Sequence, residues 1–475
     1  MKEMTNMGFM EKFNQLAEKS LLPIANKLAA QRHLTALRNG MVSSIPLSIL
    51  GGVSLIIATP PFNPEQMTQK NIFTGFLLAW YDWAQANAQA LKLPFMMSMG
   101  LMGLFIAFSI AHNLAEEYEM PALDASIVST VTFLLVTSPA FSGVPLNQIA
   151  ENMSSEEMAS LGLLSLPMQY LDAKGIFTAI IVSIVCVEIM RVLKEKNIRF
   201  KMPDGVPPAI AASFDAILPL FLCTGLFYGI SLLIQNITGG DLIPALIMKL
   251  LAPAMSGLDS LLGICLITFL AQLFWFFGLH GASITQFVRL PFMSAYIVAN
   301  ATAFSNGEPL QHYFTQPFWS YIIAIGGGGS TLALAFLMLR ARSAQMRQLG
   351  KIAIIPSLFN INEPLIFGTP LVLNPIMMLP FIFVPVINSI AGYLFMYFGW
   401  IGKGFVETPW TTPAPIGAAL GTMDIRAGLF VIGLIVLDLL IYFPFFRVLD
   451  QQTAKVEKQE EEEMASVALS QEQQI

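Results

Sequence analysis

The sequence predicts an all-α polytopic membrane protein. Of its 475 residues, 55% are hydrophobic and only 12% are charged, which is far from the usage of soluble domains. Its apolar segments reach the length of about 20 residues that a helix needs to cross a bilayer, and they lack the alternation of barrel strands. We therefore expect about ten transmembrane helices, with amphipathic helices at the membrane interface.

The apolar segments can be placed in order along the chain. Residues 1–33 mix Lys and Glu with apolar residues and have no small-residue cleavage site, so we expect a cytoplasmic interfacial helix there, not a signal peptide. The polar and aromatic segments 62–92, 141–172 and 240–256 are also expected at the interface. Apolar windows predict spans near 34–58, 94–112, 121–140, 174–194, 213–236, 258–280, 287–304, 317–342, 374–398 and 427–449.

The basic residues predict the orientation. With the N-terminus inside, this map places 19 of the 25 Lys and Arg residues on the cytoplasmic side, so both termini are expected there. The basic segment 194–204 marks a boundary between an N-terminal transmembrane half, 34–200, and a C-terminal half, 201–449. Residues 450–475 include a run of four glutamates and are expected to form a disordered acidic tail.

The most unusual stretch is Asn-Ile-Asn-Glu-Pro-Leu-Ile-Phe-Gly at 360–368, which places Glu363 inside a long apolar sequence. A carboxylate at membrane depth is costly, so it normally lines a cavity or pathway and has a partner. The prolines that follow argue against one straight helix. We expect a broken or hairpin helix at the floor of a binding site. The alternative role for Glu363 is to hold this broken helix together by accepting backbone N–H groups.

Among the four histidines, His280 has the most unusual surroundings, Trp-Phe-Phe-Gly-Leu-His-Gly-Ala-Ser at 275–283. The glycines permit a sharp break, so His280 is expected to face a cavity beside aromatic rings. A hydrogen-bonded structural histidine is the alternative. Together with a carboxylate, this ring could deprotonate and orient a substrate hydroxyl. His33, His112 and His312 fall at span ends or in a loop, where a solvated role is expected.

A third cluster is Glu-Thr-Pro-Trp-Thr-Thr-Pro at 407–413. Trp410 offers a flat apolar face and a donor edge, and the threonines offer hydroxyls, a combination that suits a sugar. A tryptophan of the interfacial belt is the alternative. The run Gly326–Gly329 lies inside the predicted span 317–342 and is expected to serve close helix packing. It lacks the Lys and Ser or Thr of a phosphate loop.

Five strings occur in a familiar order, and together they resemble the enzyme IIC permease of bacterial phosphotransferase systems, in the lactose/cellobiose/chitobiose branch. The likeness runs from about residue 30 to 449, and Asn-Glu-Pro is its most specific part. Asn39 stands where the family usually carries Asp. The strings are Ala-Leu-Arg-Asn-Gly at 36–40, Met-Pro-Asp-Gly-Val-Pro-Pro at 202–208, Gly-Leu-His-Gly at 278–281, Asn-Ile-Asn-Glu-Pro at 360–364 and Pro-Trp-Thr-Thr-Pro at 409–413.

The resemblance implies ten transmembrane helices with two re-entrant hairpins, an N-terminal half that forms a homodimer and a C-terminal half that holds a disaccharide. It implies that the sugar enters from outside the bacterial cytoplasmic membrane, and that a phosphorylated IIB partner, with IIA upstream, phosphorylates its 6-hydroxyl. His280 and Glu363 match the catalytic positions, and with Asn362, Trp410 and Thr411 they form the implied sugar site. No cofactor, metal or nucleic acid is implied.

Two other classes of function remain open at this point. In a proton-coupled secondary sugar transporter, Glu363 would take up and release a proton, and the product would be free sugar, not sugar phosphate. A membrane-embedded hydrolase would need a nucleophile with a base or a metal cluster, and the sequence has four scattered histidines and no H-E-x-x-H motif.

Overall fold

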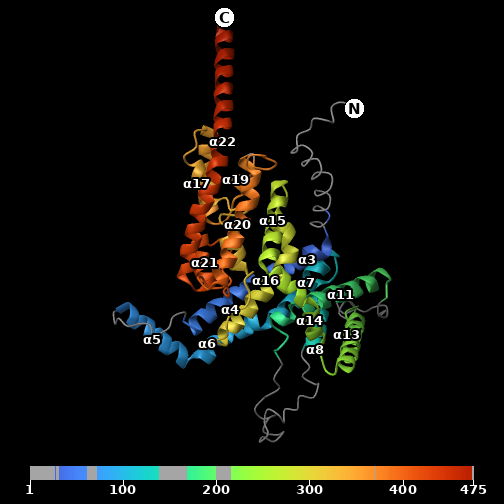
Figure 1. Ribbon diagram of the computed structural model, residues 1–475. Helices are drawn as coiled ribbons and strands as arrows, with labels where there is room; N and C mark the ends of the chain where they lie inside the picture. The colour runs from blue at the N-terminus through green and yellow to red at the C-terminus, as the bar shows by residue number, and fades with distance from the viewer. Residues whose placement is uncertain are drawn as a thin grey trace. The chain divides into compact units, whose positions relative to one another are not determined.

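The computed structural model describes residues 31–60, 72–137, 168–198, 215–369 and 371–472, together with Lys27. Within these ranges the chain is helical and contains no β-strand (Figure 1). The helices are α3 (Arg32–Val42), α4 (Ile45–Ala58), α5 (Ile72–Ala86), α6 (Ala88–Ser98), η4 (Met99–Leu101), α7 (Met102–Glu117), α8 (Ala122–Thr137), η5 (Ala173–Gly175), α11 (Ile176–Glu195), α13 (Ile217–Thr238), α14 (Ile243–Leu258), α15 (Leu261–Phe276), α16 (Gly281–Ser305), η6 (Phe318–Ile323), α17 (Leu332–Met338), α18 (Ala344–Leu358), α19 (Glu363–Gly368), α20 (Met378–Tyr397), α21 (Ala414–Thr422) and α22 (Ile425–Glu472).

The predicted fold class is confirmed. In the described part of the chain, 7 helices are long and apolar enough to cross a membrane, or up to 8 if the pair α14 and α15, bent by 73°, counts as one span. The apolar helix α8 is shorter, with 16 residues. The number of ten transmembrane helices stays a prediction.

The chain divides into two compact units. The N-terminal unit comprises Ala30–Ser256 and Leu290–Gly307, and the C-terminal unit is built from Gly257–Arg289 and Glu308–Ile475. This division assigns α13 and α14 to the N-terminal unit, whereas the predicted boundary at residues 200 and 201 lies outside the described residues. The predicted interfacial helix 1–33 and the segment 141–172 also lie mostly outside them.

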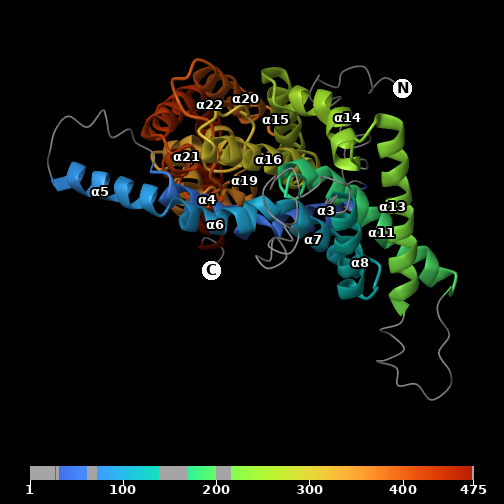
Figure 2. The same cartoon turned by 90° about the horizontal axis from the view of Figure 1, so that it is seen from below.

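In the N-terminal unit, α7 packs against α3, α8 and α11, and α13 packs against α8 and α11 (Figure 2). The small residue Gly40 permits the close approach of α3 to α7, because a Cβ atom there would lie 2.7 Å from the Ile110 Cα atom. The side chain of Tyr296 donates a hydrogen bond to the Met255 carbonyl over 2.6 Å, which fixes the second part of α16 within this unit.

In the C-terminal unit, α15 packs against α20, while α22 packs against α17, α20 and α21 (Figure 1). The predicted continuous span 317–342 is wrong. The chain forms η6, a series of turns at the glycine run, and then α17. Gly326, Gly327 and Gly329 have φ values of 74°, 100° and 78°, which a helix does not contain. Four consecutive glycines therefore break the span.

The acidic tail requires a second correction, because α22 continues to Glu472 where disorder from residue 450 is predicted. Asp450 accepts hydrogen bonds from the backbone N–H groups of Arg342 and Ser343, over 2.9 to 3.0 Å. Glu457 accepts those of residues 344 and 345, over 3.0 and 2.9 Å. The first N–H groups of a helix have no partner within it, so these carboxylates both cap α18 and hold the start of the tail.

Candidate functional site

The Asn-Glu-Pro stretch forms a turn between two helices, as the broken-helix prediction requires. Helix α18 ends at Leu358, and Asn360 adopts a left-handed conformation with φ of 62°. Asn362 then stands at the N-cap of the short helix α19, with Glu363 and Pro364 in its first turn. Proline fits the first turn because it has no backbone N–H group, and the N–H groups there have no partner within the helix. The tip of the turn thus holds Glu363 at the start of a helix.

Asn360 connects this turn to two other segments. Its Oδ1 atom accepts a hydrogen bond from the Gly326 N–H group over 2.9 Å. Its Nδ2 atom donates to the carbonyls of Trp410 and Thr412, over 2.7 and 2.9 Å. One buried amide therefore fastens the turn, the glycine run and the loop of Trp410 to one another. Asn360 was not among the predicted site residues, although it stands in the same motif as Glu363.

Asn362 reinforces this connection. Its Nδ2 atom donates to the Gly328 carbonyl over 2.6 Å and to the Thr331 hydroxyl over 2.7 Å, and the residue is only 2% exposed. A Cβ atom at Gly327 would lie 2.5 Å from the Asn362 Oδ1 atom, so this close approach requires glycine. The amide nitrogen predicted to bind sugar is thus engaged within the protein.

His280 lies between α15 and α16, two residues after Gly278, whose φ is 78°. Its Nε2 atom is 4.0 Å from the Glu363 Oε1 atom, so the two predicted catalytic residues lie together. Both side chains are about half exposed. The His280 ring lies against Trp275, with 4.3 Å between ring centroids. The predicted aromatic surroundings are therefore present.

The hydrogen bonds of His280 determine where its proton lies. The Nδ1 atom accepts the backbone N–H group of Ser283 over 3.1 Å and lies 2.9 Å from the Ser283 hydroxyl. A neutral ring whose Nδ1 accepts this amide carries its proton on Nε2. His280 therefore presents an N–H group, not a lone pair, on the side of Glu363.

The carboxylate of Glu363 has unused acceptor capacity. The 4.0 Å separation from His280 is too long for a hydrogen bond. The second oxygen, Oε2, is buried and has no hydrogen-bond partner. Polar atoms in such positions are normally satisfied, which makes this carboxylate a good acceptor for a hydroxyl donor.

Trp410 and Thr411 lie in a loop that the rest of the unit holds in place. The Tyr321 hydroxyl donates to the Pro409 carbonyl over 2.7 Å, and Asn360 binds the Trp410 carbonyl from the other side. Trp410 is 53% exposed and Thr411 is partly exposed. The structure therefore brings the backbone of this loop to the Asn-Glu-Pro turn and leaves the indole accessible.

A buried arginine lies close in sequence to His280. The charge count places Arg289 on the cytoplasmic side, and the predicted span 287–304 contains it. In the structure Arg289 lies within α16 and is 5% exposed. Its guanidinium lies 3.6 Å from the centroid of the Trp319 ring and donates to the Ala282 carbonyl over 2.9 Å. The position of Arg289 within a predicted apolar span could have indicated a buried polar contact from the sequence.

A second buried polar group lies behind the glycine run. Asp438 of α22 is fully buried, and its Oδ2 atom accepts hydrogen bonds from Ser330 over 2.6 Å and from Asn388 over 3.1 Å. Tyr442, one turn later, donates to the Gly329 carbonyl over 2.6 Å. These contacts fix the far side of the run that Asn360 and Asn362 bind. Asp438 is the one carboxylate in the predicted span 427–449, and this feature of the sequence could have indicated the buried group.

Comparisons with known proteins identify the family of this chain. The family described as "Phosphotransferase system, EIIC" matches residues 38–385. The lichenan permease IIC component of Bacillus subtilis (strain 168) is 38% identical over 94% of this chain and 96% of its own length. The cellobiose-specific EIIC component of Geobacillus stearothermophilus is 36% identical over 94% of this chain and 97% of its own.

Two further relatives extend the comparison. The lactose-specific EIICB component of Lacticaseibacillus casei is 30% identical over 94% of this chain and 73% of its own length. Among solved structures, the transporter ChbC, the IIC component of an N,N'-diacetylchitobiose-specific phosphotransferase system, has a TM-score of 0.79 and 33% identity. That match covers 93% of this chain and 99% of ChbC. The chain therefore belongs to the EIIC family, the multi-pass membrane permeases of the phosphotransferase system.

Proposed function

We propose that this permease binds a disaccharide of the cellobiose, chitobiose or lactose type from outside, and presents its 6-hydroxyl to a phosphorylated IIB protein. The pairing of His280 with Glu363 at 4.0 Å, on two separate helix breaks, is the observation that supports this most directly. The names of the relatives support the substrate class. The EIICB designation of the lactose relatives supports a IIB partner.

The two residues have different roles in this proposal. Glu363 accepts the hydrogen bond of the sugar hydroxyl and acts as the base when the hydroxyl attacks the phosphoryl group. His280 donates its Nε2–H to the substrate, since Ser283 occupies its Nδ1 atom. The separation of 4.0 Å between the His280 Nε2 and Glu363 Oε1 atoms leaves room for one sugar hydroxyl oxygen to form hydrogen bonds with both.

The remaining predicted residues support the sugar around this pair. The exposed Trp410 stacks against a sugar face and Thr411 supplies a hydroxyl, while Asn362 acts by holding the glycine run. We further propose cytoplasmic termini, a homodimer and a bacterial cytoplasmic membrane location, from the charge distribution and the family.

Membrane vesicles containing this chain test the proposal. Labelled cellobiose, diacetylchitobiose and lactose are supplied in turn together with phosphorylated IIB, and the internal sugar is analysed. We expect one of these sugars to appear inside as its 6-phosphate, with uptake unchanged when an uncoupler collapses the proton gradient. Free internal sugar, and uptake that stops with the gradient, would instead establish the proton-coupled transporter.

A further inference from the structure

A groove on the C-terminal unit has no role in the proposed sugar site. It lies along α17 and α22 and encloses about 670 Å³. Its walls are mainly apolar and include Leu439 and Phe443 of α22, while Arg340, Arg342 and Arg447 also line it. We call it the arginine groove. Its volume is within the range of about 300–1,000 Å³ that small-molecule sites occupy.

The arginines lie together at one end of this groove. The hydroxyl of Ser330, just before α17, donates a hydrogen bond to Asp438 of α22. The backbone N–H group of Arg342, just after α17, donates one to Asp450. The two pairs are twelve residues apart on both segments, so α17 and α22 run side by side in the same direction. Arg447 is therefore level with the two arginines that follow α17. The apolar walls extend from there toward Asp438.

The apolar length of the groove matches one half of a bilayer. It extends along α22 from Ile435 to Arg447, twelve residues or about 18 Å of helix. A membrane core is about 30 Å thick, so one leaflet contributes about 15 Å. Residues 425–460 contain one of the candidate spans. The groove thus combines a cationic end with an apolar wall of leaflet depth.

The charge at this end is not neutralised within the described part of the chain. Arg340, Arg342 and Arg447 are exposed and take part in none of the ion pairs there, in contrast to Arg191 and Arg426. The one acidic residue lining the groove, Asp450, already accepts backbone N–H groups at the start of α18. Three arginines against one engaged carboxylate leave a site complementary to an anion.

We propose that the arginine groove binds an anionic glycerophospholipid, with its phosphate on the three arginines and an acyl chain along Ile435, Leu439 and Phe443. Guanidinium groups bind phosphate oxygens in pairs, and basic sites between transmembrane helices bind anionic headgroups. A soluble protein partner reaches the arginines but not apolar residues a leaflet deep. This site is independent of the roles proposed for His280 and Glu363.

Lipid binding to the purified full-length protein tests this proposal. Fluorescent phosphatidylglycerol is titrated into delipidated protein in neutral detergent, with phosphatidylcholine as the zwitterionic comparison and inorganic phosphate as a competitor. The first variant is R340Q/R342Q/R447Q, and its charge-matched control is K351Q/K455Q/K458Q. The second is L439W, which fills the groove, with L440W on the exposed face as its control.

We expect phosphatidylglycerol to bind the triple-arginine variant about a hundredfold more weakly than wild type, because each arginine contributes about fivefold in affinity. L439W weakens binding several-fold, whereas both controls and phosphate at millimolar concentration leave it unchanged. Equal affinity for phosphatidylcholine would overturn the proposal, as would unchanged binding in L439W. Displacement by inorganic phosphate would reveal a free-anion site, and loss of IIB binding with lipid binding intact would reveal a protein-docking surface.

Discussion

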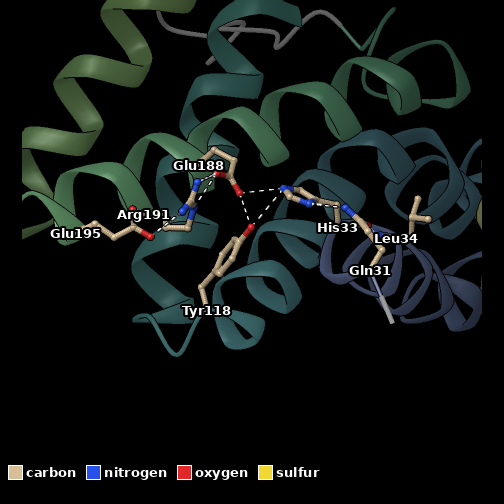
Figure 3. Close-up of polar contacts among 7 residues, drawn as sticks. All are labelled: Gln31, His33, Leu34, Tyr118, Glu188, Arg191 and Glu195. Carbon is tan, nitrogen blue, oxygen red and sulfur yellow. Dashed lines mark hydrogen bonds and ion pairs between the residues drawn. The ribbon is translucent and has the colours of Figure 1, made fainter. Parts of the chain in front are cut away.

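Two histidine–carboxylate pairs in this protein differ in how completely their carboxylates are bonded. In the N-terminal unit, Glu188 lies 2.9 Å from the His33 Nε2 atom, accepts the Tyr118 hydroxyl over 2.6 Å and binds Arg191 over 2.7 Å (Figure 3). In the C-terminal unit, Glu363 lies 4.0 Å from His280 and has an oxygen without a partner.

The difference separates a structural pair from a candidate functional one. Glu188 of α11 contacts His33 at the start of α3 and Tyr118 directly after α7, and both of its carboxylate oxygens accept hydrogen bonds within the protein (Figure 3). A carboxylate that is already saturated has little to offer a ligand, whereas one with unused acceptor capacity does. Replacing Glu363 is therefore expected to affect function, whereas replacing Glu188 is expected to affect stability.

The largest expected effect is that of Glu363→Gln on phosphorylation. Removing the proposed base and its charge should lower the rate of IIB-dependent sugar phosphorylation by about 10²–10⁴-fold. The matched variant Glu188→Gln should phosphorylate at close to the wild-type rate, measured with the same vesicles and IIB. Equal losses in both variants would remove the distinction between the two pairs.

The next effect concerns the donor role of His280. A glutamine amide can donate a hydrogen bond but cannot act as a base, so His280→Gln should retain at least about tenfold more phosphorylation activity than His280→Ala. A lost hydrogen bond at a buried polar group costs about 1–3 kcal/mol. The initial rate of sugar phosphate formation is measured for His280→Gln and for His280→Ala. If glutamine is as inactive as alanine, His280 is the base.

A smaller effect is expected on the stability of the N-terminal unit when Glu188 is replaced. Glu188→Gln removes a charge that binds His33, Tyr118 and Arg191, but the side chain is 26% exposed, so we expect a loss of about 1 kcal/mol. Thermal unfolding in detergent should show a lower Tm for this variant than for wild type. Glu363→Gln should keep the wild-type Tm, and a drop there would assign Glu363 a structural role.

The smallest effect is a pH dependence at Tyr118. Burial, and then its hydrogen bond to Glu188, raise the pKa of this tyrosine to about 12 from its ordinary value near 10. The raised pKa means that its stabilising contribution is complete below about pH 10 and is lost as the pH rises toward 12. Between these values the Tm of wild type should fall more steeply than that of Tyr118→Phe. Parallel curves would contradict the raised pKa of Tyr118.

The other histidines show what sequence position alone does not predict. The sequence indicates solvated roles for His33 and His312, yet His33 pairs with Glu188, and His312 lies 3.0 Å from Asp259. These partners are 155 and 53 residues away along the chain. No local pattern encodes such a pairing, because it depends on which helix ends the fold brings together.

The sequence by itself determined the membrane fold class and the break at Asn-Glu-Pro, and it pointed to His280 and Glu363 as candidate site residues. These follow from local chemistry, since hydropathy, proline and glycine conformation and the cost of an intramembrane carboxylate act within one segment. Only the tertiary structure decided that Asn360 joins the glycine run to the Trp410 loop, through partners 34 and 50 residues away. It alone also decided that Asp450 and Glu457 anchor the tail, because the amides they satisfy belong to another helix.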